Sequence, residues 1–217
     1  MSVIVLAGMI GAGKSSYTEM IARRLGTEPF YENVAYNPVL DKFYNNPKKW
    51  AFSLQIYFLN ARFSSIKAAL GDDNNVLDRS IYEDELFTRI NHIQGNISDI
   101  DMEIYSDLLA NMMEELEGTA KKSPDLLIYL HGSFEKILHH IQKRGRSFEK
   151  VEVGDDRYNY FKLLWTEYQN WYDAYDHSAK MAISIDEYDI IENPEHEDKV
   201  MAIIEEALDE ARRPAAK

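Results

Sequence analysis

Val3-Ile4-Val5-Leu6-Ala7-Gly8-Met9-Ile10-Gly11-Ala12-Gly13-Lys14-Ser15-Ser16 is the stretch that decides the fold. Its first five residues form an apolar, β-branched run that predicts a buried strand. Gly8 to Ser15 then fits the phosphate-binding pattern G-x-x-x-x-G-K-[ST] without a mismatch, and a helical run from Ser16 to Leu25 follows. Because strand, loop and helix are the context that this pattern requires, we predict a site for a nucleotide triphosphate.

Each residue type in this loop has a physical reason. Glycines let the backbone take positive φ angles, so that successive N–H groups point into one concavity at the start of the helix. Unpaired donors and the helix dipole favour an anion there. Lys14 adds a mobile charge for the β- and γ-phosphates, and the Ser15 hydroxyl suits Mg²⁺. The predicted nucleotide-binding residues are Gly8, Met9, Ile10, Gly11, Ala12, Gly13, Lys14, Ser15 and Ser16.

The composition narrows the classes of protein and partner. A formal charge of −13 argues against nucleic acid and against anionic membrane as partners, since both select basic surfaces. The chain has no cysteine, which excludes a disulfide scaffold and a thiolate site. With 217 residues, 45% of them apolar, and no linker or repeat, we expect one domain over residues 1–217. The opening apolar run is too short for a signal or transmembrane helix, so we expect a cytoplasmic location.

Apolar strands alternate with helices along the whole chain. The predicted strands are Val3–Ala7, Glu28–Glu32, Val76–Leu77, Leu126–Leu130 and Met181–Ile185. The predicted helices cover about 16–25, a short helix that starts at Asn37-Pro38, 47–70, 82–94, 98–117, 134–143, 155–175 and 195–212. Unpatterned apolar strands between helices are typical of a parallel sheet that is covered on both sides. We therefore predict a three-layer α/β fold with a five-stranded parallel sheet flanked by helices.

Charged residues stand at the ends of the second and third strands, as the phosphate loop stands at the end of the first. In such sheets ligands bind beyond the carboxyl ends of the strands. Glu32 suits accepting the proton of an attacking hydroxyl, although an acidic side chain at a strand end can equally be solvated. Asp78 suits Mg²⁺ and Arg79 suits charge on reacting oxygens; the alternative is a capped helix start with a local ion pair.

Lys143-Arg144-Gly145-Arg146 is a basic cluster in an acidic chain. Arginines on a glycine-containing loop suit a lid, here about 144–153, that closes over a transferring phosphate and excludes water. The alternative is that these cations complement the dipole at the end of a helix. That alternative explains one or two of the charges better than it explains the cluster.

The long helix after Asn46-Pro47 combines apolar and polar positions. Gln55 and Arg62 lie seven residues apart, so one face of the helix presents both. A buried Gln offers a donor and an acceptor side by side, as the edge of a nucleobase requires, whereas most helical Gln residues are on the surface. The apolar stripe of the same helix includes Trp50, Leu54, Tyr57, Phe58 and Ala61.

Taken together these motifs resemble the deoxynucleoside kinase family, and most of all its Gram-positive bacterial deoxyadenosine/deoxyguanosine kinase branch. The resemblance runs from about Val3 to Tyr188. It rests on the phosphate loop, Glu32, Phe43-Tyr44, Phe52 to Tyr57 with Arg62, Asp78-Arg79-Ser80 with Asp84, and Arg144-Gly145-Arg146 with Glu149. Two departures stand out, since many members have Glu in place of Asp78 and some have a further lid arginine in place of His140.

The resemblance implies a P-loop kinase fold, ATP and Mg²⁺ as cofactors, and a homodimer. It implies phosphorylation of a purine deoxynucleoside, most of all deoxyadenosine, at the 5′-hydroxyl. Glu32 resembles the general base, Arg79 the arginine that assists it, and Arg144 and Arg146 the lid arginines. The residues that resemble substrate ligands are Tyr44 and Glu149 for the 3′-hydroxyl, Gln55 for the base edge, and Arg62 with Asp84 for the far side of the base.

Alternatives remain open at this point. Deoxyguanosine or deoxycytidine would also satisfy Gln55, because its amide can rotate. A nucleoside monophosphate kinase of the thymidylate kinase type has a similar loop and lid, but needs cations where this chain has Glu32. A nucleotide-dependent switch is a third alternative, although D-x-x-G and N-K-x-D, which GTPase switches usually carry, do not occur here.

Overall fold

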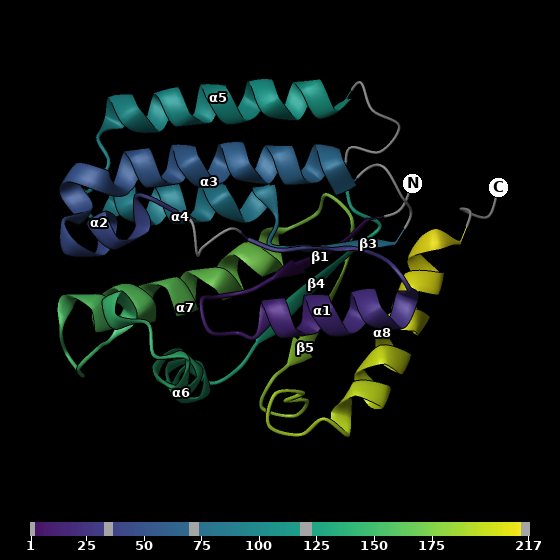
Figure 1. Cartoon of the computed structure of the whole chain (residues 1–217). Coiled ribbons are helices and arrows are strands. Elements are labelled where there is room, and N and C mark those ends of the chain that lie inside the picture. Colours follow the sequence, from purple (N-terminus) through teal and green to yellow (C-terminus); the bar gives the residue numbers. More distant parts are fainter. Residues whose placement is uncertain (1–2, 33–36, 70–73, 118–122, 214–217) are drawn as a thin grey trace.

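The computed structural model describes residues 3–32, 37–69, 74–117 and 123–213. Its elements form a central sheet with helices on both sides (Figure 1). In chain order they are β1 (Val3–Ala7), α1 (Lys14–Leu25), β2 (Pro29–Phe30), α2 (Leu40–Asn45), α3 (Pro47–Ala69), β3 (Asn75–Asp78), α4 (Ile81–Ile93), α5 (Asp99–Glu117), β4 (Leu126–His131), α6 (Phe134–Arg144), a 3₁₀ turn η1 (Ser147–Glu149), α7 (Asp156–Ala174), β5 (Ala179–Ser184) and α8 (His196–Arg212).

The sheet has five parallel strands, as predicted, and their order is β2-β3-β1-β4-β5. The first strand lies in the middle, where Leu6 pairs with Asp78 of β3 on one side and with Ile128 of β4 on the other. All strands run the same way, so their carboxyl ends share one edge. The phosphate loop and the segments after β2 and β3 therefore meet there.

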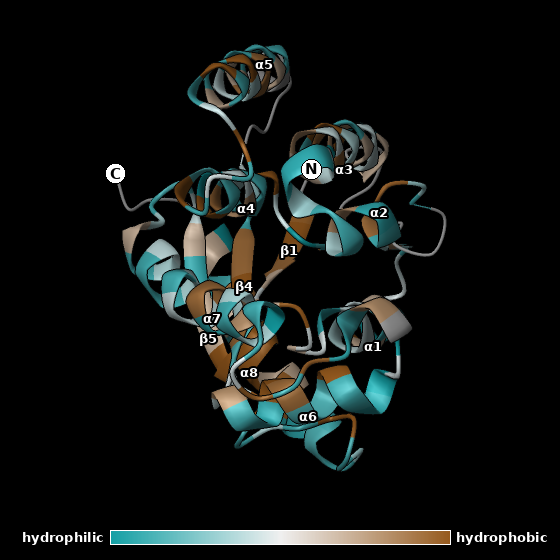
Figure 2. Cartoon of the chain, turned by 90° about the vertical axis from the view of Figure 1, so that its left-hand side faces the viewer, coloured by the Kyte–Doolittle hydropathy of each residue, from teal (hydrophilic) through white to brown (hydrophobic). Residues whose placement is uncertain are grey.

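Helices bury both faces of the sheet. Figure 2 shows the apolar strands β1 and β4 between α3 and α4 on one side and α1, α6 and α8 on the other. The α7 helix joins the first group, because Tyr129 of β4 stacks on Tyr168 of α7 with ring planes 6° apart. Ile4, Leu6, Ile128 and Leu130 are fully buried in the resulting core. None of the helices in the described ranges is long and apolar enough to cross a membrane.

Element boundaries mostly lie within two residues of the prediction; the short helix α2, for example, starts at Leu40 and not at Pro38. The second strand is only two residues long, because it is an edge strand whose Pro29 has no N–H to donate. The last strand begins two residues earlier than predicted, at Ala179, since polar Lys180 still pairs with Leu127. Ser133 caps α6, with its hydroxyl accepting from the N–H of Lys136.

The long helix α3 buries a different face from the predicted apolar stripe. Only Leu54 of that stripe is buried; Trp50, Tyr57, Phe58 and Ala61 are half-buried. Gln55 and Arg62 are instead 3% and 5% exposed. Buried polar side chains need partners. Arg62 pairs with Asp84 and Glu32, and Gln55 lines a cavity beside the helix.

Candidate active site

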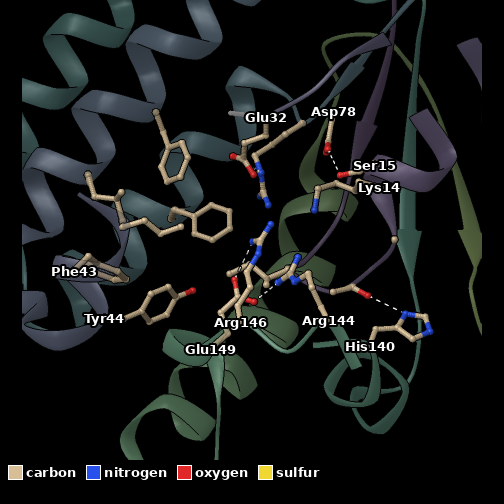
Figure 3. A pocket seen from close by; sticks show the side chains of 18 of the residues that line it. Lys14, Ser15, Glu32, Phe43, Tyr44, Asp78, His140, Arg144, Arg146 and Glu149 are labelled. Carbon is tan, nitrogen blue, oxygen red and sulfur yellow. Dashed lines mark hydrogen bonds and ion pairs between the residues drawn. The ribbon is translucent and has the colours of Figure 1, made fainter. Parts of the chain in front are cut away.

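A cavity of about 380 Å³ opens at the carboxyl edge of the sheet (Figure 3). Lys14 and Ser15 lie at one end and Phe43 and Tyr44 at the other. The predicted residues that line it are Ile10, Gly11, Gly13, Lys14, Ser15, Ser16, Glu32, Tyr44, Gln55, Asp78, Arg79, Asp84, Arg144, Arg146 and Glu149. Gly8, Met9 and Ala12 lie beneath the loop surface, and Arg62 sits behind Glu32. Segments far apart in the sequence thus come together as predicted.

The phosphate loop depends on glycine at the positions where the backbone is tightest. Gly8 has a φ of +144°, and a Cβ atom there would lie 2.5 Å from the carbonyl oxygen of Leu130. Gly11 has a φ of +87°, and its Cβ would lie 2.9 Å from the carbonyl oxygen of Ile137 on α6. The loop therefore packs directly on the backbone of β4 and α6, and no larger residue fits.

The N-terminus of α1 is left open. Side chains of Ser80, Ser133 and Asp155 cap the helices α4, α6 and α7, but Gly13 at the start of α1 supplies no such acceptor. Unpaired N–H groups at a helix start are an anion site. Lys14 next to them donates to the carbonyl oxygens of Gly8 and Met9 at 2.8 and 3.0 Å. Burial and the Arg79 charge lower the pKa of Lys14 to about 8, and the charges of Asp78, Glu83 and Glu32 oppose this shift only in part.

Ser15 and Asp78 fit a magnesium site. The Ser15 hydroxyl donates to Asp78 Oδ2 at 2.5 Å, and Asp78 Oδ1 is buried without a hydrogen-bond partner. Hard oxygen donors with spare capacity are what Mg²⁺ takes, usually with waters and substrate phosphates as its other ligands. No group of three His, Cys, Asp or Glu side chains gathers among the described residues.

Glu32 is held between two arginines at the cavity wall. Its Oε1 lies 2.9 Å from Arg62 Nη2 and 3.1 Å from Arg79 Nε. Burial by itself raises the pKa of Glu32, but the charges of Arg79, Arg62 and Lys14 outweigh it and lower the pKa to about 2. The carboxylate is therefore ionised at neutral pH and is a hydrogen-bond acceptor only.

The inner end of the cavity combines a buried ion pair with an amide. Arg62 makes a two-bond contact with Asp84, with both N···O distances at 3.0 Å. Burial raises the pKa of Asp84, against the opposing effect of Arg62. Gln55 lines the same end, among Leu54, Phe58 and other apolar side chains. Apolar walls with a few fixed polar groups are typical of a pocket for a planar ring.

Tyr44 and Glu149 face each other across the mouth of this inner pocket. Tyr44 stacks on Phe148 with ring centroids 5.5 Å apart, and burial, together with Tyr160 and Glu149, raises the pKa of its hydroxyl. Glu149 is 3% exposed and pairs with Arg144 and Arg146. The two arginines are each about one-third exposed at the cavity rim.

Gly145, with a φ of +72°, ends α6 and turns the chain so that the arginines on either side of it both point to Glu149. This placement supports the lid interpretation for Arg144 and Arg146. Lys143 fits the helix-end alternative better, because it pairs with Glu192 at 2.5 Å. His140 does not extend the lid: it is buried beneath the phosphate loop, where its Nδ1 lies 3.0 Å from the Gly11 carbonyl oxygen.

Sequence reasoning missed three polar side chains beside the site. Glu83 and Tyr168 are fully buried and bonded to each other and to Arg79, and Arg157 donates to the carbonyl oxygen of Tyr44. Only Glu83 left a signal, because Ser80-x-x-Glu83 is a capping-box pattern. Tyr168 is one of four tyrosines on α7, and Arg157 is the single arginine of that helix, with no motif around it.

Comparison with known proteins places this geometry in one family. A family model described as deoxynucleoside kinase matches residues 4–209. The deoxyguanosine kinase of Lactobacillus johnsonii is 51% identical over 201 residues, which cover 93% of this chain and 90% of that protein. The deoxyadenosine kinase of Lactobacillus acidophilus is 44% identical, and the match covers 96% of this chain and 97% of that protein.

Solved structures of related enzymes indicate the same family. The structure of deoxyadenosine kinase from M. mycoides with bound dCTP is similar with a TM-score of 0.77 at 30% identity, covering 94% of this chain and 99% of that one. The segment that the family model matches contains the phosphate loop, Glu32, the Asp78-Arg79-Ser80 segment and the lid. The chain belongs to the deoxynucleoside kinase family and is an ATP-dependent deoxynucleoside kinase.

Proposed function

We propose that the enzyme transfers the γ-phosphoryl group of ATP to the 5′-hydroxyl of a purine deoxynucleoside. The observation that carries this proposal is the ionised carboxylate of Glu32 at the acceptor side of the cavity. A carboxylate accepts a hydrogen bond from a neutral alcohol but repels the phosphate of a nucleoside monophosphate. The position of Glu32 therefore favours a nucleoside over a nucleotide as acceptor.

In the proposed mechanism the phosphate loop and Lys14 bind the triphosphate. Mg²⁺, when bound at Ser15 and Asp78, supplies charge neutralisation on the phosphate oxygens. Arg79, Arg144 and Arg146 stabilise the charge that develops on the transferring group. Glu32 orients the 5′-hydroxyl and takes its proton as the phosphorus–oxygen bond of ATP breaks and the new bond to the 5′-oxygen forms.

For the nucleoside, we propose that Tyr44 and Glu149 hold the 3′-hydroxyl and that Gln55 binds the base edge. The ion pair of Arg62 and Asp84 closes the far side of the base pocket. Support comes from the lining of the cavity, which contains Tyr44, Glu149, Gln55 and Asp84 together.

Two purine substrates are candidates. Deoxyadenosine is the substrate expected from the sequence, and the M. mycoides and Lactobacillus acidophilus relatives bear that name. Deoxyguanosine is favoured by a specific observation, since the relative of higher identity, from Lactobacillus johnsonii, is named deoxyguanosine kinase. Gln55 can bind either base by rotating its amide, so the shape of the pocket walls determines which purine is preferred.

An assay with ATP and deoxyadenosine, deoxyguanosine, deoxycytidine, thymidine and dAMP side by side tests the proposal. We expect phosphorylation of at least one purine deoxynucleoside and none of dAMP. Activity confined to dAMP would instead identify a nucleoside monophosphate kinase. Activity confined to deoxycytidine or thymidine would refute the purine assignment but leave the enzyme class intact.

The role of Glu32 is tested by Glu32→Gln, which keeps the shape of the side chain but removes its charge. We expect kcat to fall by about 10²–10⁴-fold while the KM of the nucleoside changes little. Steady-state kinetics on the folded variant measures both. Wild-type kcat in this variant would exclude Glu32 as the base.

We also propose a homodimer and a cytoplasmic location. The exposed isoleucines of α5 support the dimer, since Ile100 and Ile104 are 69% and 49% exposed on one helix. Light scattering during gel filtration distinguishes a dimer from a monomer. ATP as the phosphate donor supports the location.

A further inference from the structure

Glu83 is a buried carboxylate beside the active site that the proposed mechanism does not use. It stands in the first turn of α4, is 0% exposed, and does not line the cavity. Its Oε2 accepts from the backbone N–H of Ser80 at 2.7 Å, as in any capping box. Its Oε1 points inward and accepts from the backbone N–H of Gly8 at 3.0 Å and from the Tyr168 hydroxyl at 2.8 Å.

A helix cap explains only half of these contacts. Capping requires one oxygen, and glutamine serves as well as glutamate in this position. The inner oxygen instead joins the first residue of the phosphate loop to α7. A fully buried carboxylate also carries a desolvation cost, which is seen in the raised pKa of Glu83. Capping alone does not account for a charge in this place.

The residue that Glu83 surrounds is Arg79. The backbone of Arg79 has a φ of +89°, an unfavourable conformation for a residue with a side chain. Hydrogen bonds hold it on both sides: its N–H donates to the carbonyl oxygen of Leu6 at 2.9 Å, and the next N–H, of Ser80, donates to Glu83. The carboxylate therefore fixes the strained turn from which the Arg79 side chain leaves.

The side chain of Arg79 is held by the same network. Its Nη1 donates to the Tyr168 hydroxyl at 2.6 Å and lies 3.5 Å from Glu83 Oε1. Its guanidinium lies over the ring of Phe87, 4.7 Å from the centroid. These contacts hold the guanidinium beside Glu32, with Nε 3.1 Å from Oε1. A chain of bonds thus runs from Gly8 through Glu83 and Tyr168 to the guanidinium.

We propose that Glu83 is a positioning residue that fixes Arg79 and the first turn of the phosphate loop relative to each other. It touches neither substrate; it acts through Arg79 and Gly8. The inference rests on the proposed role of Arg79 in phosphoryl transfer. A displacement of about an ångström between the reacting groups slows such reactions strongly. A direct link between Arg79 and the phosphate loop therefore increases the rate of phosphoryl transfer.

Glu83→Gln separates capping from positioning. Its amide oxygen preserves the bond from Ser80 N–H, but its amide nitrogen then faces the N–H of Gly8, donor against donor. We expect kcat to fall by about 10- to 100-fold, with the KM of the deoxynucleoside within about twofold of wild type. Ser98→Ala is the control, because Ser98 accepts from Asp101 N–H at the start of α5, away from the site. That variant loses stability but keeps wild-type kcat.

Tyr168→Phe supplies a second, independent measurement. It removes the hydroxyl between Arg79 and Glu83 and leaves the helix cap intact. We expect a smaller fall in kcat, and a double variant no slower than Glu83→Gln alone, since both changes break one network.

A purely structural Glu83 would lower the unfolding temperature of Glu83→Gln and leave kcat of the folded enzyme unchanged, which would overturn the proposal. If Glu83→Gln does not fold, wild-type kcat in Tyr168→Phe overturns it equally. The wild-type substrate assay decides the proposed function separately from both variants.

Discussion

The buried ammonium of Lys14 lowers the stability of the folded protein. In the ligand-free enzyme its ammonium is 7% exposed and bonded only to carbonyl oxygens. A lysine whose pKa is lowered to about 8 by burial and by Arg79 is destabilising as long as it stays charged. The phosphates of ATP would relieve this cost.

Lys14→Met should therefore stabilise the ligand-free protein while abolishing phosphoryl transfer. The expected gain at pH 7 is roughly 2–3 kcal/mol in the free energy of unfolding. Its sign follows from the lowered pKa: the cost in wild type is fully present below pH 8 and fades as the pH rises toward 10.5, where the unfolded lysine also loses its proton.

Denaturant unfolding of both proteins at pH 7 and pH 10 measures this difference. The gap between variant and wild type should shrink at the higher pH. A variant that is less stable than wild type at pH 7 would show that the ammonium is better paired than the structure indicates.

Single residues also mark the limit of what the sequence could predict. Lys14, Ser15 and Asp78 were predictable, because a loop motif or a strand end fixes their places. Glu83 was not, since it is one of 37 acidic residues and its burial depends on α7 packing against α4. The positive φ of Arg79 was invisible for a similar reason: its stabilising bonds come from Leu6 and Glu83.

The phosphate loop and α6 form one packed unit. Gly11 lies against the backbone of α6, and His140 of the same helix bonds to the Gly11 carbonyl oxygen. Arg144 and Arg146, the proposed lid arginines, stand at the end of α6. A single helix thus connects the phosphate loop with these two arginines.

Gly11→Ala should push α6 and the loop apart. The new Cβ would lie 2.9 Å from a backbone oxygen, in a left-handed conformation that disfavours alanine. We expect kcat/KM for ATP to fall on the order of 10²-fold, measured by steady-state kinetics.

Gly26→Ala is the matched control for this change. Gly26 also has a positive φ, at +67°, but nothing lies within 4 Å of its Cβ position. It should cost about 1 kcal/mol of stability without affecting kinetics. Equal kinetic effects of the two substitutions would show that backbone strain, and not the contact with α6, is responsible.

The strands and helices were largely predictable because apolar runs and turn residues determine them locally. The inner face of α3 was the exception. Its hydropathy pattern predicted an apolar stripe, whereas the structure buries Gln55 and Arg62. Polar residues are buried there because Asp84 of α4 and Glu32 after β2 supply partners for Arg62, which no pattern within α3 reveals.

For the whole molecule, the sheet order explains why the first strand is decisive. This strand lies in the middle of the sheet, between β3 and β4. The phosphate loop that follows it therefore lies among the segments that follow the neighbouring strands. The five-stranded parallel sheet was correctly predicted from the sequence, but the order of its strands was not. The single domain stays a prediction.

One domain implies one cooperative unfolding transition that ATP and Mg²⁺ shift as a whole. At a ligand concentration 100 times Kd the stabilisation is about 2.7 kcal/mol. For a chain of this size that should raise Tm by roughly 5–10 °C in calorimetry. Two transitions, of which ATP moves only one, would contradict the prediction.

Glu149 has two kinds of partner: the arginines beside it in the structure and the sugar of the proposed substrate. In the structure it neutralises Arg144 and Arg146, and in the proposed function it also accepts the 3′-hydroxyl of the sugar. One carboxylate cannot serve all three partners fully. Binding of the sugar therefore weakens the ion pairs of Glu149 with the two guanidinium groups and frees them for the triphosphate.

Nucleoside and ATP should then bind with positive cooperativity, each tightening the other by the same factor. Titration calorimetry of a non-hydrolysable ATP analogue with and without nucleoside would show this reciprocity, and Glu149→Gln would remove it; identical affinities in wild type would mean that the enzyme registers its two substrates independently.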